Sequence, residues 1–285
     1  MTVPASLPIQ AIRAELVQAC AGHNRIIVTA PTGSGKSTRV PGFLADEVLP
    51  GGGQVVCLQP RRLAARMLAR RVAGERGAAL GGEVGYRVRF DWRMGPATRI
   101  VYETDGILLQ ELRRDPDLRR VGAIVFDEFH ERHLYGDILL GLALTLQAAR
   151  RPDLKIVVMS ATLEAAPLEQ FLAPCARVQA GGRCYPVDIR YHGERSARPP
   201  PVWEQASQAW AQSRAAAGGG HTLIFMPGAH EIRRTVSALH LAGAPAQRIF
   251  PLYGELTPAA QDAAVAPDRV PKIIVATNIA ETSVT

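Results

Sequence analysis

The sequence has few cysteines and no pairing pattern among them. The four cysteines are scattered along the chain and form no CxxC pair: Cys20, Cys57, Cys175 and Cys184. Zinc sites and disulfide frameworks both depend on numerous or closely spaced cysteines, so neither kind of site is expected here. We interpret the four side chains as reduced structural thiols.

Long apolar runs are also missing. No stretch reaches the roughly 18 apolar residues that a membrane helix needs, and the N-terminal segment has no basic stretch followed by an apolar one, as a secretion signal would have. We therefore expect a cytoplasmic protein with no membrane partner. With 285 residues, 47% of them apolar, the chain is long enough to form two domains with buried cores.

Lysine is scarce, since Lys36, Lys155 and Lys272 are the only lysines among 33 basic residues. The formal net charge of +7 therefore rests mainly on arginine, whose planar guanidinium donates two hydrogen bonds to a phosphate at once. This composition permits a polyanionic partner such as nucleic acid. Arginine-rich coding in a GC-rich genome would produce the same bias, so composition alone does not decide.

Short runs that are apolar throughout alternate with helical patterns in the first half of the chain. The runs cover residues 25–30, 54–59, 99–103, 122–127 and 155–160, with helices expected over 61–73, 106–113 and 137–149. Continuous apolar runs are typical of parallel strands covered on both faces. The fold class predicted is α/β, with a doubly wound parallel sheet whose ligands gather at the carboxyl ends of the strands.

The same alternation resumes after a stretch rich in turn residues and proline near residues 181–201. Strands are expected over 221–228, 248–254 and 272–278, with helices over 229–242 and 257–265. We predict domain 1 over 1–185, a linker over 186–201 and domain 2 over 202–285. Because a parallel sheet of three strands with one end open is poorly covered, we expect domain 2 to be incomplete and the chain to be part of a longer protein.

The stretch TAPTGSGKST follows the first strand and opens a helix. With Ala30 in the position of the first glycine, it fits the spacing of a P-loop. Its backbone N–H groups can surround phosphates at the positive end of the helix dipole, where Lys36 reaches the β and γ oxygens and the Ser37 hydroxyl can hold Mg²⁺. The predicted nucleotide-binding residues are Thr32, Gly33, Ser34, Gly35, Lys36, Ser37 and Thr38.

A second group of charged residues, in the stretch IVFDEFHERHLYGD, follows the strand expected at 122–127. Asp127 ends that strand and can complete the Mg²⁺ shell, while Glu128 can polarise the attacking water. A zinc site is disfavoured, because His130 and His133 have no cysteine partner and lack the i, i+4 spacing of an HExxH helix. The roles of Glu131, Arg132 and His133 stay open; local ion pairs would explain them.

Asp127-Glu128-Phe129-His130 resembles the DEAH box of superfamily 2 helicases, with phenylalanine in the alanine position. Further stretches resemble the other helicase motifs in the expected order: LQPRRLAAR for motif Ia, YETDGILL for Ib, MSAT for III, LIFMPG for IV and ATNIAETSVT for V. The match spans roughly residues 8–285. The DEFHER variant is most similar to bacterial HrpB-type ATP-dependent helicases of the DEAH/RHA group, and the resemblance implies two RecA-like P-loop domains with parallel sheets.

The resemblance also implies roles for residues away from the P-loop. Arg61 and Arg62, with Thr104, Asp105 and Gly106, lie at two strand-to-helix corners that face RNA or DNA in the family. Such grips act on sugar and phosphate, so binding should be largely independent of sequence and sensitive to salt.

Residues of motifs III and V complete the implied set. His130 is expected to act in catalysis with Lys36, Asp127 and Glu128, and to be coupled to the nucleic-acid face through the hydroxyls of Ser160 and Thr162. In the second domain, Thr277 and Asn278 are expected to approach nucleic acid, and Ser283 the γ-phosphate.

The function predicted is an ATP-dependent helicase or translocase that uses ATP or another nucleoside triphosphate with Mg²⁺ on single-stranded nucleic acid, RNA favoured over DNA. No counterpart of the arginine-rich motif VI precedes Thr285, so we expect the 285-residue chain to hydrolyse nucleotide weakly. The alternatives are a DNA-directed translocase, a nucleotide-dependent switch that remodels proteins, and a module that binds nucleotide and nucleic acid without hydrolysis. The sequence gives no oligomeric state.

Overall fold

The computed structural model describes residues 7–161, 166–182, 187–191, 199–217 and 220–283. The chain divides into two compact units, Met1–Cys184 and Tyr185–Val284. Thr162 and Cys184 lie outside the described residues. Among the described residues, no helix combines the length and apolarity that crossing a membrane requires.

The first unit is built on an eight-stranded sheet with the order β4-β3-β5-β2-β6-β7-β1-β8. Neighbouring strands are parallel except β3 and β4, which form an antiparallel hairpin at one edge. The strands are β1 (Arg25–Thr29), β2 (Gln54–Gln59), β3 (Val84–Val88), β4 (Asp91–Arg93), β5 (Ile100–Thr104), β6 (Val121–Phe126), β7 (Lys155–Ser160) and β8 (Ala176–Gln179). The predicted α/β class is confirmed, and the five runs expected in this half are all strands.

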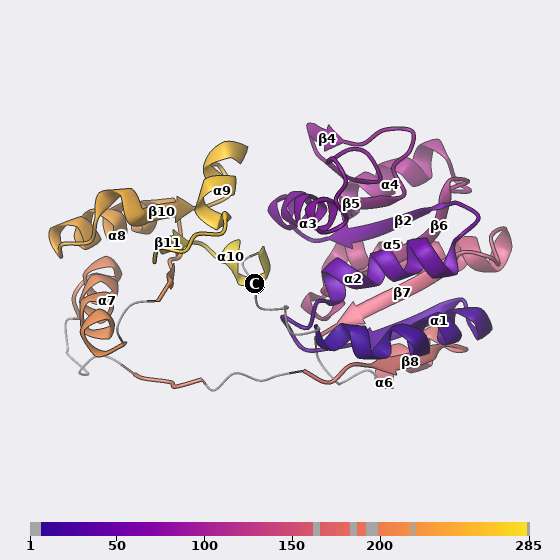
Figure 1. Cartoon of the computed structure of the whole chain (residues 1–285), viewed down its shortest axis with the longest axis horizontal. Helices are drawn as coiled ribbons and strands as arrows, with labels where there is room; N and C mark the ends of the chain where they lie inside the picture. Colours follow the sequence, from indigo (N-terminus) through magenta and orange to yellow (C-terminus); the bar gives the residue numbers. More distant parts are fainter. Residues whose placement is uncertain (1–6, 162–165, 183–186, 192–198, 218–219, 284–285) are drawn as a thin grey trace. The chain divides into compact units, whose positions relative to one another are not determined.

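Helices cover both faces of this sheet (Figure 1). One face carries η1 (Pro8–Ile12), α1 (Arg13–Gly22), α2 (Lys36–Phe43), η2 (Leu44–Val48) and α3 (Arg62–Glu75). The other carries α4 (Asp105–Arg114), α5 (Leu134–Ala149) and α6 (Ala166–Leu172). Side chains of one strand alternate between two cores, so that Ile26 and Val28 pack in the first core and Ile27 in the second. Burial on both faces explains why the strands are apolar throughout.

The second unit contains a three-stranded parallel sheet with the order β10-β11-β9. Its elements are α7 (Val202–Ala217), β9 (Thr222–Phe225), α8 (Ala229–Leu241), η4 (Ala246–Arg248), β10 (Ile249–Leu252), α9 (Pro258–Val265), β11 (Ile273–Ala276) and α10 (Ala280–Ser283). The central strand β11 is fully buried, whereas the edge strand β9 exposes Leu223 and Phe225. The sequence predicts double-sided cover for the strands of the first unit only; for this three-stranded sheet it predicts poor cover.

Helix α7 was not predicted as a helix, although its residues were assigned to the second domain. It packs on α8, where the Ser207 hydroxyl donates a hydrogen bond to the Ala238 carbonyl at 3.1 Å. Trp210 of α7 is buried in the same core as Ile232 and Leu239 of α8. The helix therefore belongs to the fold of the second unit.

Candidate nucleotide site

The P-loop joins β1 to α2 and depends on two glycines. Gly33 and Gly35 have φ values of +76° and +92°, in the left-handed region that favours glycine. A Cβ atom at Gly35 would lie 2.8 Å from Leu7 Cδ1 and 3.2 Å from Ile9 Cγ2. Leu7 and Ile9 therefore pack closely against the loop, and the Ile9 N–H donates a hydrogen bond to the Ser34 carbonyl at 3.2 Å.

The side chains of the loop differ strongly in exposure. Thr32 and Gly33 are exposed, whereas Ser34 and Lys36 are buried at 2% and 3% exposure. The buried Ser34 hydroxyl has no hydrogen-bond partner within the described part of the chain. Because buried polar atoms are nearly always paired, we infer that a ligand oxygen or a water bonds to this hydroxyl in the working protein.

Two further contacts hold the first turn of α2 in place. The Thr38 hydroxyl donates to the Gly35 carbonyl at 3.1 Å, and the Tyr102 hydroxyl of β5 donates to the Ser37 carbonyl at 2.7 Å. Tyr102 is fully buried, so this second bond anchors the helix to β5. The Tyr102 contact was not anticipated from the sequence.

At the end of β6, Asp127 is held by bonds to both of its carboxylate oxygens. Its Oδ2 accepts from the Gln59 amide at 2.8 Å, and its Oδ1 accepts from the Glu128 backbone N–H at 2.9 Å. Each oxygen keeps acceptor capacity beyond that one bond. Gln59 was missed as a site residue, because it reads as the last residue of an apolar strand.

Lys36 and Glu128 meet in an ion pair although 92 residues separate them. The Lys36 Nζ lies 3.0 Å from Glu128 Oε1, and the two side chains are only 4% and 14% exposed. Only β7 lies between β1 and β6 in the sheet, so the residues that follow the carboxyl ends of these two strands lie close together. Burial and the neighbouring Asp127 raise the pKa of Glu128, and the Lys36 ammonium opposes that shift. A phosphate that binds Lys36 must compete with Glu128 for the ammonium.

His130 lies beside Glu128, at the end of β7. Its Nδ1 is 3.5 Å from Glu128 Oε2 and accepts a hydrogen bond from the Ala161 backbone N–H at 3.4 Å. The backbone of β7 also reaches the P-loop, since the Ser160 carbonyl accepts from the Ala30 N–H at 3.1 Å. The contact to His130 described here is thus from backbone; coupling through the hydroxyls of Ser160 and Thr162 stays a prediction.

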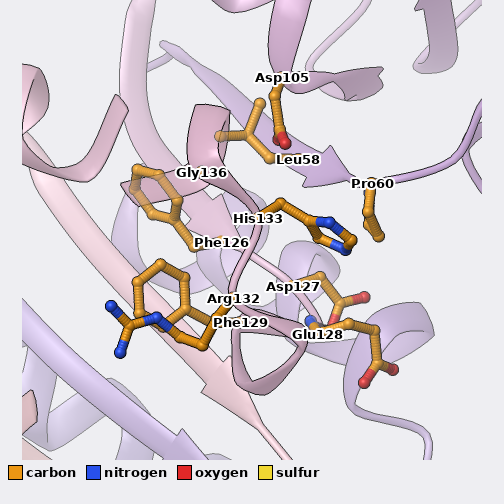
Figure 2. Close-up of a pocket in the computed structure, with 10 residues that line it drawn as sticks. All are labelled: Leu58, Pro60, Asp105, Phe126, Asp127, Glu128, Phe129, Arg132, His133 and Gly136. Carbon is orange, nitrogen blue, oxygen red and sulfur yellow. Dashed lines mark hydrogen bonds between the residues drawn. The ribbon is translucent and has the colours of Figure 1, made fainter. Parts of the chain in front are cut away.

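The two predicted nucleic-acid corners lie at the ends of the adjacent strands β2 and β5. Arg61 precedes α3 and Arg62 begins it, while Thr104 precedes α4 and Asp105 and Gly106 begin it. Figure 2 shows Pro60 and Asp105 around one pocket with Asp127, Glu128 and His133. Residues at the two corners and the two carboxylates therefore line the same pocket.

Burial, rather than neighbouring charge, governs the pKa of Asp105. Burial raises the pKa of Asp105 to about 6, and the nearby His133 opposes that shift.

Thr277 and Asn278 follow β11 in the second unit, with Asn278 exposed, and Ser283 lies in α10. The Ser283 side chain lies outside the described part, and its role stays a prediction.

A triad around the buried Glu103, beside the second corner, was not foreseen. Arg87 of β3 donates two hydrogen bonds to Glu103 Oε2, at 2.9 and 2.7 Å, and also pairs with Glu111 of α4. Glu103 is completely buried, and its other oxygen has no hydrogen-bond partner within the described residues. Burial raises the pKa of Glu103 from 4.5 to about 7, although Arg87 opposes the shift.

This raised pKa predicts that the chain loses stability as pH rises. The unfolded state releases the Glu103 proton near pH 4.5 and the folded state only near 7, so stability falls between those values, by about 3 kcal/mol. Glu103→Gln should remove this part of the pH dependence and make the chain more stable than the wild type at pH 8. Thermal unfolding from pH 5 to 8 measures it.

Glu83→Gln is the matched control, since the Glu83 side chain is 34% exposed and pairs with Arg76. That variant should keep the wild-type slope of stability against pH. Parallel slopes for the wild type and Glu103→Gln would contradict the assignment.

The expected Mg²⁺ ligands are compatible with the residues present. Ser37 and Asp127 offer oxygen donors, which hard divalent cations prefer, and the buried Lys36–Glu128 pair lies against Asp127. No cluster of three or more His, Cys, Asp or Glu side chains suited to a metal occurs in the described residues. A Mg²⁺ site of this kind does not need one, because it uses few protein ligands together with water and phosphate oxygens.

A parallel sheet, a strand–loop–helix with a buried lysine and a carboxylate pair at the same sheet edge together define a P-loop nucleoside-triphosphatase domain. Residues 8–171 match the model of a family described as DEAD/DEAH box helicase. This chain belongs to the DEAD/DEAH box helicase family.

Individual relatives agree with that assignment. The ATP-dependent RNA helicase HrpB of Escherichia coli is 40% identical over 98% of this chain, which covers 34% of that protein. The ATP-dependent RNA helicase HrpA homolog of Haemophilus influenzae is 37% identical over 99% of this chain and 22% of its own length. A crystal structure of the E. coli DEAH/RHA helicase HrpB superposes with a TM-score of 0.86 at 38% identity, covering 98% of this chain and 36% of that one. The predicted resemblance is confirmed, and the chain spans about a third or less of these relatives.

Proposed function

We propose that this chain is the nucleotide-hydrolysing part of an ATP-dependent helicase that moves along single-stranded nucleic acid, RNA favoured over DNA. The observation that carries the proposal is the buried Lys36–Glu128 pair, 3.0 Å long, at the mouth of a P-loop in a member of the DEAD/DEAH box helicase family. In this pair the proposed phosphate-binding cation lies next to the candidate general base.

In this proposal the loop from Thr32 to Thr38 binds the phosphates of ATP or another nucleoside triphosphate. Backbone N–H groups at the start of α2 and the Lys36 ammonium neutralise phosphate charge. Ser37 and Asp127 would hold Mg²⁺, which when bound neutralises charge on the phosphates. The roles of Gln59 and Asp127 are linked, because the Gln59 amide fixes the orientation of the Asp127 carboxylate.

Glu128 acts as the general base in this scheme. The pKa of Glu128 is raised toward neutral pH, where a base accepts a proton more effectively. When phosphates take over the Lys36 ammonium, the Glu128 carboxylate loses its counter-ion and becomes a stronger proton acceptor. His130, at 3.5 Å from Glu128, is positioned to respond to that change.

Nucleic acid binds, in this proposal, at the corners formed by Arg61 with Arg62 and by Thr104, Asp105 and Gly106. Thr277 and Asn278 would contribute from the second unit. The arrangement of a domain over 1–185, a linker over 186–201 and a domain over 202–285 is part of the proposal, and so is a cytoplasmic site of action. The preference for RNA rests on the names of the relatives, HrpB and an HrpA homolog, which are described as RNA helicases.

The test is ATP hydrolysis by the full-length protein with single-stranded RNA, single-stranded DNA of the same sequence, or no polymer. We expect RNA to stimulate hydrolysis by about tenfold or more, and added salt to weaken the stimulation because the contacts are to phosphates.

Equal or greater stimulation by DNA would favour the DNA-directed translocase instead. Hydrolysis that responds to neither polymer would contradict a nucleic-acid motor. Nucleotide binding without any hydrolysis would leave only a binding module.

A further inference from the structure

Glu131, three residues after Glu128, connects the carboxylate turn to the first nucleic-acid corner. Its Oε2 accepts a hydrogen bond from His133 Nε2 at 2.8 Å and lies 3.6 Å from the Arg61 guanidinium. Its side chain is only 15% exposed, and its Oε1 is buried without a hydrogen-bond partner among the described residues. A buried carboxylate oxygen without a donor is unfavourable, so this residue gains from any rearrangement that supplies one.

The backbone around Glu131 is held in an uncommon conformation. The short helix η3 (Phe129–Glu131) is bounded by Glu128 and Arg132, whose φ values are +49° and +51°. A left-handed residue other than glycine is strained, and persists only when its surroundings enforce it. The Glu131 N–H donates to the Glu128 carbonyl at 2.9 Å. A shift of Glu131 is therefore transmitted directly to the backbone of Glu128.

The contact between Glu131 and Arg61 is weak enough to exchange. Charge-assisted hydrogen bonds of this type are about 2.7–2.9 Å long, whereas this pair is 3.6 Å apart. The Arg61 side chain is 18% exposed at the N-terminus of α3, where a phosphate is favoured by the helix dipole as well. A nucleic-acid phosphate would compete with Glu131 for the guanidinium.

We propose that Glu131 is a positioning residue through which nucleic acid at Arg61 controls the orientation of Glu128. Without nucleic acid, Arg61 and His133 together hold Glu131 and, through η3, hold Glu128 in its pair with Lys36. A phosphate on Arg61 leaves Glu131 with His133 alone, and the turn relaxes. The inference rests on the proposed function, since it assigns the path by which nucleic acid stimulates hydrolysis.

His133 extends this path to the second corner. It lines the pocket of Figure 2 together with Pro60 and Asp105. Glu131 thus contacts Arg61, at one corner, and His133, which lines the same pocket as Asp105 of the other corner. Both corners are thus linked to Glu131, whose N–H donates a hydrogen bond to the Glu128 carbonyl.

The test is Glu131→Gln in the full-length protein, with ATP hydrolysis measured with and without single-stranded poly(U). We expect the ratio of the rates with and without RNA to fall about tenfold, a typical size for the coupling between two sites, because the rate without RNA rises toward the stimulated rate once Glu131 no longer restrains Glu128. Asp137→Asn is the matched control. Asp137 pairs with Arg132 of the same segment at 3.0 and 3.1 Å, and its loss should leave the stimulation unchanged.

A double mutant separates this path from a structural defect. Arg61→Gln alone should lose stimulation, and adding Glu131→Gln should lower it no further, because both act on one contact. Rates that fall equally with and without RNA, or losses that multiply in the double mutant, would overturn the inference. A wild-type protein that RNA does not stimulate would overturn the proposed function itself, and the inference with it.

Discussion

Replacing Glu128 with glutamine is expected to abolish ATP hydrolysis while nucleotide binding is kept. The substitution removes the proton acceptor, and general-base catalysis typically contributes about 10²–10⁴-fold, so single-turnover hydrolysis should slow by about a thousandfold. Binding of Mg·ATP, measured by calorimetric titration, should stay equal to the wild type or become tighter. The reason is that the Lys36 ammonium no longer shares its charge with a carboxylate 3.0 Å away.

Glu169→Gln is a suitable control for this experiment. Glu169 lies on α6 and pairs with Arg177 at 3.0 Å, away from the P-loop, so its loss should leave both binding and hydrolysis as they are. Unchanged hydrolysis in Glu128→Gln would remove Glu128 from the role of base. Loss of nucleotide binding in the same variant would show that Glu128 holds the loop in shape.

The sequence predicted the buried strands well and the sheet edge poorly. Strands covered on both faces must be apolar throughout, so their runs stand out from the polar loops between them. The hairpin β3–β4 gives no such signal, because it carries charged side chains and turns at Phe90, whose φ of +67° is unusual for a residue other than glycine. β8 is a short edge strand with a single buried side chain, Val178. Helix α7 directly follows a proline run and was missed as well.

For the candidate site, the sequence predicted the residues of each local motif but not the contacts between motifs. The P-loop spacing indicates Lys36, and the end of an apolar run indicates Asp127 and Glu128. Their approach depends on the strand order β6-β7-β1, which no local pattern records. Gln59 and Glu131 were missed or left open for the same reason: their partners, Asp127 and Arg61, lie 68 and 70 positions away in the chain.

Replacing Lys36 with methionine is expected to have two separable effects. The first is a loss of Mg·ATP affinity of about 100-fold or more, because charge-assisted bonds to the phosphates are removed. The second is a loss of stability of about 3 kcal/mol, because Glu128 is left buried without its counter-ion. The second effect should shrink at low pH, where the Glu128 carboxyl, whose pKa is already raised, takes up a proton.

The double mutant Lys36→Met with Glu128→Gln distinguishes the two effects. Removing the buried charge along with its partner should restore most of the stability lost in Lys36→Met, measured by denaturant unfolding, because no uncompensated ion remains. Nucleotide affinity should stay low, since the phosphates still lack the ammonium. A double mutant that also regains affinity would mean that Lys36 acts on ATP only by neutralising Glu128, and the assignment of Lys36 as the phosphate-binding cation would be wrong.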